Sequence, residues 1–187
     1  MNWKEALERL KTGNTRFVKD QLERKLQNPE RKKALTGGQH PFAIILSCAD
    51  SRVIPELAFD TGLGEIFVVR VAGNVPNPSS IASIEYAVAH LGSKLIVVMG
   101  HESCGAVAAA IEGGDNGTNL NHLLSFISPV VEENKKEDMA EIIKQNAMRS
   151  SDELVKKSQI ISDAVENGEV KIATAYYKLG TGEVEFL

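Results

Sequence analysis

The sequence predicts an α/β protein with a mainly parallel central sheet flanked by helices. Three observations predict this fold class: apolar runs of the length of buried strands, helical segments between most of these runs, and a turn signal before the last short run. Strands that are separated by helices normally pair in parallel. We therefore expect about four parallel strands, followed by an antiparallel edge strand after the turn.

The predicted strands share a high content of β-branched residues and are bounded by turn signals. They are FAIIL (42–46), EIFVVRV (65–71), KLIVVM (94–99) and VKIATAYY (170–177). The sequence LGTG (179–182) is typical of a turn, and EVEFL follows it. We expect this last run to close a hairpin as the edge strand.

The helical segments carry apolar residues at intervals of three and four. The first such segment is the N-terminal twenty residues, and the others are 79–91, the Ala-rich 104–111, and one or two longer helices over about 139–165. The Gly-rich sequence IEGGDNGTN (111–119) is typical of a surface loop.

The chain has the length of one domain, because 187 residues lie within the usual single-domain range. A charged segment containing proline separates the first helix from the first strand. We therefore describe residues 1–36 as an N-terminal helical arm and residues 37–187 as the α/β core of a single domain.

Composition and charge exclude several function classes. The chain is 43% hydrophobic and 25% charged, as in ordinary globular proteins. Its 21 Lys and Arg against 25 Asp and Glu give a net charge of −4 without a basic stripe, so we expect no nucleic-acid partner. No secretory signal or membrane-spanning run is evident, so we expect a cytoplasmic protein without a membrane partner.

Two short motifs bring metal-binding residue types to the ends of predicted strands. Cys48 follows the first strand in SCADSRV, and His101 and Cys104 follow the third in GHESCGAV. Ligands of parallel sheets bind at the carboxyl ends of the strands, where these two loops can converge. Two thiolates and one imidazole suit zinc, and three protein ligands with an open fourth position are typical of catalytic sites.

Other features of the two loops support this hypothesis, although a less specific interpretation stays open. Asp50 is the nearest candidate for a fourth ligand, and Arg52 supplies a charged partner in the same loop. Cys104 begins a predicted helix, whose dipole favours a thiolate, and Gly105 allows close approach of the backbone. Taken singly, however, a buried cysteine is often inert, and the HxxC spacing is a weak pattern.

Six segments together resemble the β-class carbonic anhydrases over almost the full chain. They are LKTGNTRFV (10–18), CADSRV (48–53), FVVRVAGNV (67–75), SIEYAV (83–88), GHESCG (100–105) and YYKLGTGEV (176–184). The resemblance implies reversible hydration of carbon dioxide to bicarbonate and a proton. It also implies one zinc ion per chain, held by Cys48, His101 and Cys104, which activates the attacking water.

The resemblance also implies a catalytic dyad of Asp50 and Arg52. In an open state of the family, Arg52 holds the Asp50 carboxylate away from zinc, and Asp50 accepts a hydrogen bond from the zinc-bound water. In a closed state of some members, Asp50 itself becomes the fourth ligand. Arginine suits this task because its planar guanidinium binds a carboxylate through two parallel hydrogen bonds.

The substrate pocket is assigned by resemblance alone. Gln39, Phe67 and Tyr86 match pocket positions of plant-type relatives, and we expect Gly105 to allow close approach to the substrate. Relatives with an accessory bicarbonate pocket carry Trp three positions before the first ligand cysteine, where this chain has Ile45. This departure argues against that form of regulation.

A proton must leave the site after each turnover, and three histidines are shuttle candidates by residue type only: His40, His90 and His122. The resemblance further implies a homodimer or homotetramer. Two alternatives stay open: a carbonyl sulfide or carbon disulfide hydrolase with the same ligands, and a non-catalytic zinc or dithiol protein in which Asp50 permanently closes the site.

Overall fold

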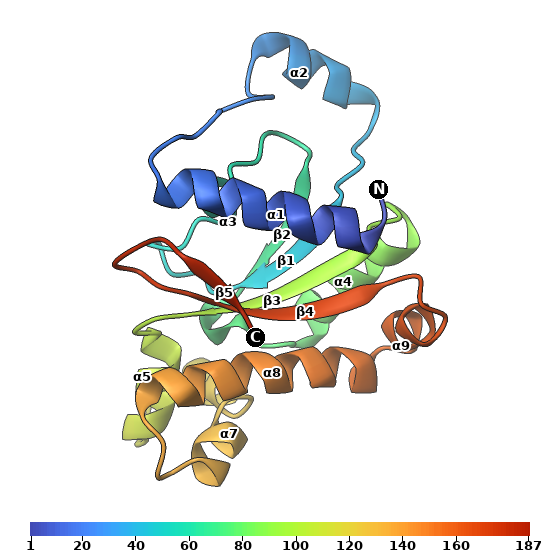
Figure 1. Ribbon diagram of the computed structural model, residues 1–187. Helices are drawn as coiled ribbons and strands as arrows, with labels where there is room; N and C mark the ends of the chain where they lie inside the picture. The colour runs from blue at the N-terminus through green and yellow to red at the C-terminus, as the bar shows by residue number, and fades with distance from the viewer.

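A five-stranded sheet forms the centre of the protein in the computed structural model, which describes residues 1–187 (Figure 1). The strand order is β2-β1-β3-β4-β5; β1 to β4 pair in parallel, and β5 is antiparallel to β4. The strands are β1 (Ala43–Ser47), β2 (Ile66–Arg70), β3 (Leu95–His101), β4 (Lys171–Tyr177) and β5 (Val184–Phe186). The predicted fold class is therefore confirmed, including the antiparallel edge strand.

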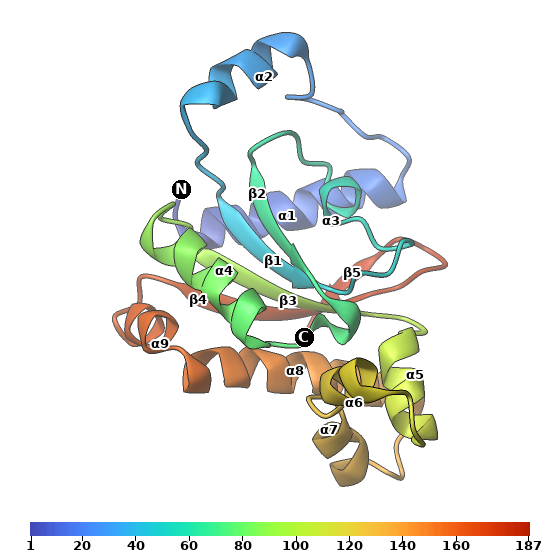
Figure 2. The same ribbon diagram turned by 180° about the vertical axis from the view of Figure 1, so that it is seen from behind.

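Helices cover both faces of the sheet because alternate strand residues are apolar on both sides. Ala43 and Ile45 pack on one face beneath α1 (Trp3–Val18) and α3 (Pro55–Ala58). Ile44 and Leu46 pack on the other (Figures 1 and 2). The helices of this second face are α4 (Pro78–Ala89), α8 (Met139–Lys157) and α9 (Gln159–Glu166).

The N-terminal segment divides into a packed part and an exposed part. In α1, Ala6 and Leu10 are fully buried against the sheet, so within one chain this helix belongs to the core. By contrast, α2 (Pro29–Ala34) has no buried residue and lies above the rest of the chain (Figure 1). A short 3₁₀ helix, η1 (Leu35–Gly37), then leads to β1. The boundary that the sequence suggested between residues 36 and 37 stays a prediction.

Most differences from the sequence analysis concern short helices. The region over about 139–165, predicted as one or two helices, is two helices, because Ser158 ends α8 and caps α9 with its side chain on the Ile161 amide. Helix α5 (Gly105–Glu112) follows the third strand as expected. Four short elements carried no periodic signal in the sequence: α2, α3, α6 (Thr118–Leu124) and α7 (Ser128–Glu133). No helix of the protein is both long enough and apolar enough to cross a membrane.

Candidate metal centre

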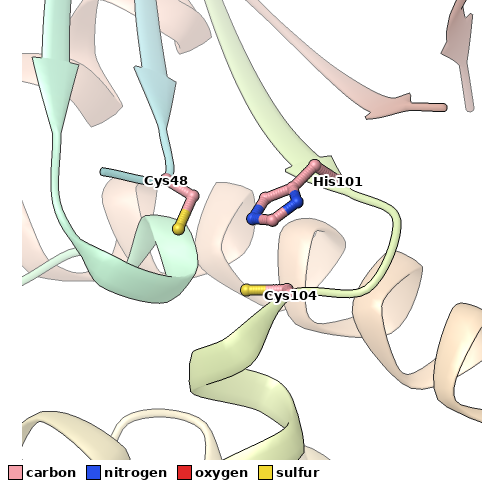
Figure 3. A group of neighbouring side chains, drawn as sticks. All are labelled: Cys48, His101 and Cys104. Atoms are coloured by element: carbon pink, nitrogen blue, oxygen red, sulfur yellow. The ribbon is translucent and has the colours of Figure 1, made fainter. Parts of the chain in front are cut away.

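Cys48, His101 and Cys104 converge at the carboxyl end of the sheet (Figure 3). One donor atom from each residue lies within 4.8 Å of the other two. All three side chains are buried, with exposed fractions of 5%, 0% and 1% respectively. The prediction that the two loops meet at this edge is therefore confirmed by the geometry.

Strand register explains this convergence. β1 and β3 are adjacent and parallel, and Ser47 pairs with Met99. Cys48 follows β1 directly, and His101 is the last residue of β3, so the two side chains reach the same edge. The chain then turns at Ser103, whose φ of 54° lies in the left-handed region, and Cys104 becomes the N-cap of α5.

His101 is held in the orientation that a metal ligand needs. Its Nδ1 lies 2.9 Å from the backbone oxygen of Glu102, so the neutral imidazole that donates from Nδ1 keeps a lone pair on Nε2. Nε2 is buried and has no hydrogen-bond partner in the protein. A buried unpaired nitrogen is costly unless a ligand engages it, so the three residues fit a metal ion.

The two thiols differ in how easily they ionise. Hydrogen bonds from the Cys104 thiol and the Gly73 amide lower the pKa of Cys48 below its usual range. The hydrogen bond that the Cys104 thiol gives to Cys48 raises the pKa of Cys104, and burial beside the ionised Cys48 raises it further. The pair therefore readily releases one proton but holds the second, and a metal cation at the site would favour loss of both.

Asp50 and Arg52 form a bidentate ion pair beside these three side chains. Arg52 Nε donates to Asp50 Oδ1 at 3.0 Å, Nη2 donates to Oδ2 at 2.7 Å, and the Arg52 amide also donates to Oδ1. These bonds hold the pKa of Asp50 well below its usual range. Asp50 Oδ2 lies 3.9 Å from His101 Nε2, so the carboxylate faces the metal-binding group while Arg52 holds it.

Arg70, the last residue of β2, is a further positioning residue that the sequence analysis missed. Its Nε donates to the Cys48 carbonyl at 3.1 Å, and its Nη2 donates to the Asp50 carbonyl at 2.7 Å. The available signal was an arginine at the carboxyl end of a strand that is otherwise apolar. Arg52 also donates to the carbonyl of Ser103 at 3.3 Å, so both arginines restrain the loops.

The predicted pocket residues lie away from the metal-binding group, except Gly105, which begins α5 directly after Cys104. Phe67 pairs with Ile44, four residues before Cys48, which places it about 13 Å along the sheet from the metal-binding end. Tyr86 on α4 is 49% exposed, and its ring centroid lies 6.4 Å from that of Phe67. Gln39 is exposed and precedes β1. One chain therefore does not bring these three side chains to the site.

The three remaining histidines are also outside the site. His40 lines a cavity of about 330 Å³ at the amino end of the strands. The ring centroids of His90 and Tyr86 lie 5.2 Å apart. Those of His122 and Phe126 lie 5.5 Å apart, with the two rings packed edge to face. A shuttle role for any of them stays a prediction.

Comparisons with known proteins are consistent across the chain. Residues 43–184 match the carbonic anhydrase family. Carbonic anhydrase 2 of Mycobacterium tuberculosis is 37% identical over 184 residues, covering 95% of this chain and 89% of the relative. One of two tetrameric β-carbonic anhydrases of Sordaria macrospora superposes with a TM-score of 0.79 at 27% identity, covering 86% of this chain and 87% of that one. The Coccomyxa β-carbonic anhydrase in complex with acetazolamide superposes with a TM-score of 0.77 at 28% identity, covering 83% of this chain and 75% of that one.

Proposed function

Since the chain belongs to the β-class carbonic anhydrase family of lyases, we propose that it catalyses the zinc-dependent, reversible hydration of carbon dioxide to bicarbonate and a proton. The observation that carries this proposal is the buried group of Cys48, His101 and Cys104, whose donor atoms lie within 4.8 Å of one another. Two sulfurs and one imidazole are a donor set that zinc accepts while keeping a fourth position for water.

In this proposal Cys48 Sγ, Cys104 Sγ and His101 Nε2 hold one zinc ion per chain. When bound, the ion supplies the positive charge that makes hydroxide available from water near neutral pH. Carbon dioxide has no charged group that the protein could bind, so catalysis depends on orienting the nucleophile toward it rather than on tight substrate binding. This task falls to side chains next to the metal ligands.

We propose that Asp50 orients the attacking water and that Arg52 holds the Asp50 carboxylate in place. The Asp50 carboxylate faces His101 and stays ionised at neutral pH, so it can accept a hydrogen bond from the attacking water and orient its lone pair. Arg52 donates two side-chain hydrogen bonds to this carboxylate, one to each oxygen. This engagement supports a resting state in which Asp50 is not a metal ligand, and it disfavours the non-catalytic alternative.

We further propose a homo-oligomer in which a partner copy completes the substrate pocket. Gln39, Phe67 and Tyr86 are assigned to the pocket by family resemblance. Within one chain Phe67 and Tyr86 lie far from Cys48, and Gln39 precedes β1 at the strand end opposite Cys48. A second copy could bring its own three residues to this site. The tetrameric state of the Sordaria macrospora relatives supports such an assembly. A cytoplasmic location and the absence of nucleic-acid and membrane partners stay predictions.

Side-by-side turnover measurements test the choice of substrate. The zinc-loaded protein is assayed for carbon dioxide hydration by stopped flow and for carbonyl sulfide and carbon disulfide hydrolysis by release of hydrogen sulfide. We expect rapid hydration of carbon dioxide and little sulfide release. Faster turnover of either sulfur compound would assign the protein to the hydrolase alternative, and zinc-loaded protein that is inactive on all three between pH 6 and 9 would support the non-catalytic one.

A further inference from the structure

A backbone amide donates to one of the proposed metal ligands. The Gly73 N–H points at Cys48 Sγ with an N···S distance of 3.3 Å. Gly73 lies in the 3₁₀ turn η2 (Ala72–Asn74), which follows β2 and contacts the ends of β1 and β3. A hydrogen bond to a thiolate withdraws charge from the sulfur, so this amide affects how much charge Cys48 can give to a bound metal.

The turn that presents this amide needs glycine for two reasons. Gly73 has a φ of 69°, in the left-handed region that other residues rarely adopt. A Cβ atom there would also lie 2.6 Å from Ile127 Cδ1 and 3.2 Å from Ala106 Cβ. The turn therefore accepts glycine alone, because any side chain at this position would be strained and would clash with Ile127.

A buried amide side chain also holds this turn, through the carbonyl of Gly73. Asn146 lies in the middle of α8 with 2% of its surface exposed, and its Nδ2 donates to the Gly73 carbonyl at 3.0 Å. Its neighbours on the buried face of α8 include Ile142, Ile143 and Ala147. An amide in such a position costs free energy unless it is hydrogen-bonded, so this bond accounts for its presence.

Helix α8 is itself fixed relative to the metal-binding end of the sheet. It packs along β3, and a Cβ at Gly100 would lie 3.0 Å from Ile143 Cγ2. Gly100 directly precedes His101, so the helix that carries Asn146 packs closely against the residue before a proposed ligand. Asn146 therefore connects the η2 turn to the part of the molecule that positions His101.

We propose that Asn146 is a positioning residue of the metal centre. By holding the Gly73 carbonyl it fixes the turn whose amide donates to Cys48 Sγ, and in this way it limits the charge that the sulfur donates to the metal. A less negative sulfur leaves the metal a stronger Lewis acid. This inference rests on the proposed function for its effect on turnover, although its effect on the metal–sulfur bond is independent of turnover.

The test uses Asn146→Leu, which keeps the volume of the side chain and removes its donor. Full-length protein is loaded with Co²⁺ in place of zinc, and the sulfur-to-cobalt charge-transfer band is recorded. We expect the band to move to longer wavelength, because a thiolate that loses a hydrogen bond gives up an electron more easily. In the zinc-loaded variant we expect the pH midpoint of hydration to rise by about 0.5 to 1 unit, since the metal becomes a weaker Lewis acid.

Asn14→Leu is the matched control. Asn14 is also a buried amide, but its Nδ2 donates to the Ala58 and Gly182 carbonyls on the α1 side of the sheet. This variant should lose stability while keeping the wild-type band and pH midpoint. If Asn146→Leu does not fold, Asn146→Ala replaces it, because alanine removes the donor without adding a charge or a branched side chain.

Two results would overturn the inference: a folded Asn146 variant with an unchanged charge-transfer band, or an equal band shift in Asn14→Leu. Failure of the proposed function gives a different result. In that case wild-type protein loaded with zinc would not hydrate carbon dioxide, while the band of the Asn146 variant would still report on the Cys48 sulfur.

Discussion

The two ends of the parallel sheet differ in whether one chain brings the side chains assigned to a site together. At the carboxyl end, Cys48, His101 and Cys104 are buried and in contact range, and Asp50 is bonded to Arg52. At the amino end lie three of the residues assigned to the substrate pocket, which are exposed or half-buried and far from this group: Gln39, Phe67 and Tyr86. One chain therefore assembles the metal-binding group and the Asp50–Arg52 pair at the carboxyl end, but it does not bring the side chains of the amino end to them.

This contrast separates two kinds of functional residue. Metal ligands have to be placed to within a fraction of an ångström, which adjacent strands and their register achieve within one chain. The walls of a pocket for a small apolar molecule can instead be shared between two chains.

We expect the largest loss of activity when a metal ligand is removed. Cys48→Ser or His101→Ala should lose zinc and reduce carbon dioxide hydration by more than about 10³-fold, because two remaining donors do not hold zinc against water. Metal analysis and stopped-flow hydration measure this result. A variant with full zinc and full activity would show that the carboxyl end is not the catalytic site.

Asp50→Asn tests the residue that aims the nucleophile. The amide keeps the shape of the carboxylate but removes its charge, so the variant should keep most of its zinc and lose about 10²- to 10³-fold in kcat. Zinc content and kcat are measured on the same sample. Activity equal to wild type would contradict the role proposed for Asp50.

Arg52→Lys tests whether geometry or charge matters in the ion pair. Lysine can supply the charge but not the two parallel hydrogen bonds that Arg52 forms with Asp50. We expect a loss of about tenfold in kcat with zinc content unchanged. The kinetics should be compared with those of Lys178→Arg, a charge-preserving substitution at a surface ion pair with Glu183. A fully active Arg52→Lys variant would mean that a point charge suffices.

The smallest effect is expected at the amino end. The double variant Phe67→Ala/Tyr86→Ala should retain zinc and lose about three- to tenfold in kcat/KM, because only apolar contact with the substrate is removed. Co-assembly of this variant with Cys48→Ser should recover activity, since a mixed pair has one site with intact ligands and intact aromatic residues. Recovery would show that the pocket is shared between chains.

The same co-assembly can contradict the shared pocket. If the mixture has only the activity expected from its separate components, although mass spectrometry shows mixed oligomers, the aromatic residues act within their own chain or not at all.

The sequence predicted the sheet and the metal group well for a physical reason. Strands such as 42–46 and 94–99 are buried on both faces, so their composition alone identifies them. His101 and Cys104 follow one strand and Cys48 another, and parallel pairing then brings them to one edge. The predicted antiparallel edge strand followed in the same way from the turn at 179–182.

Other parts could not be predicted because their causes are not local. The position of Arg70 at the end of an apolar strand marks it as unusual but does not reveal its bonds to the carbonyls of Cys48 and Asp50, since those contacts cross between two strands. The bond from Asn146 to Gly73 spans 73 positions in the sequence. Short helices such as α2 have no buried face and therefore no hydrophobic periodicity to reveal them.

The central claim is that one metal ion, held by Cys48, His101 and Cys104, drives the hydration of carbon dioxide. The most direct test is the hydration rate of protein with known zinc content, measured before treatment with a chelator, after it, and after zinc is added back. The account predicts a rate proportional to bound zinc, lost on chelation and recovered on reconstitution. A rate that survives complete removal of the metal would contradict it.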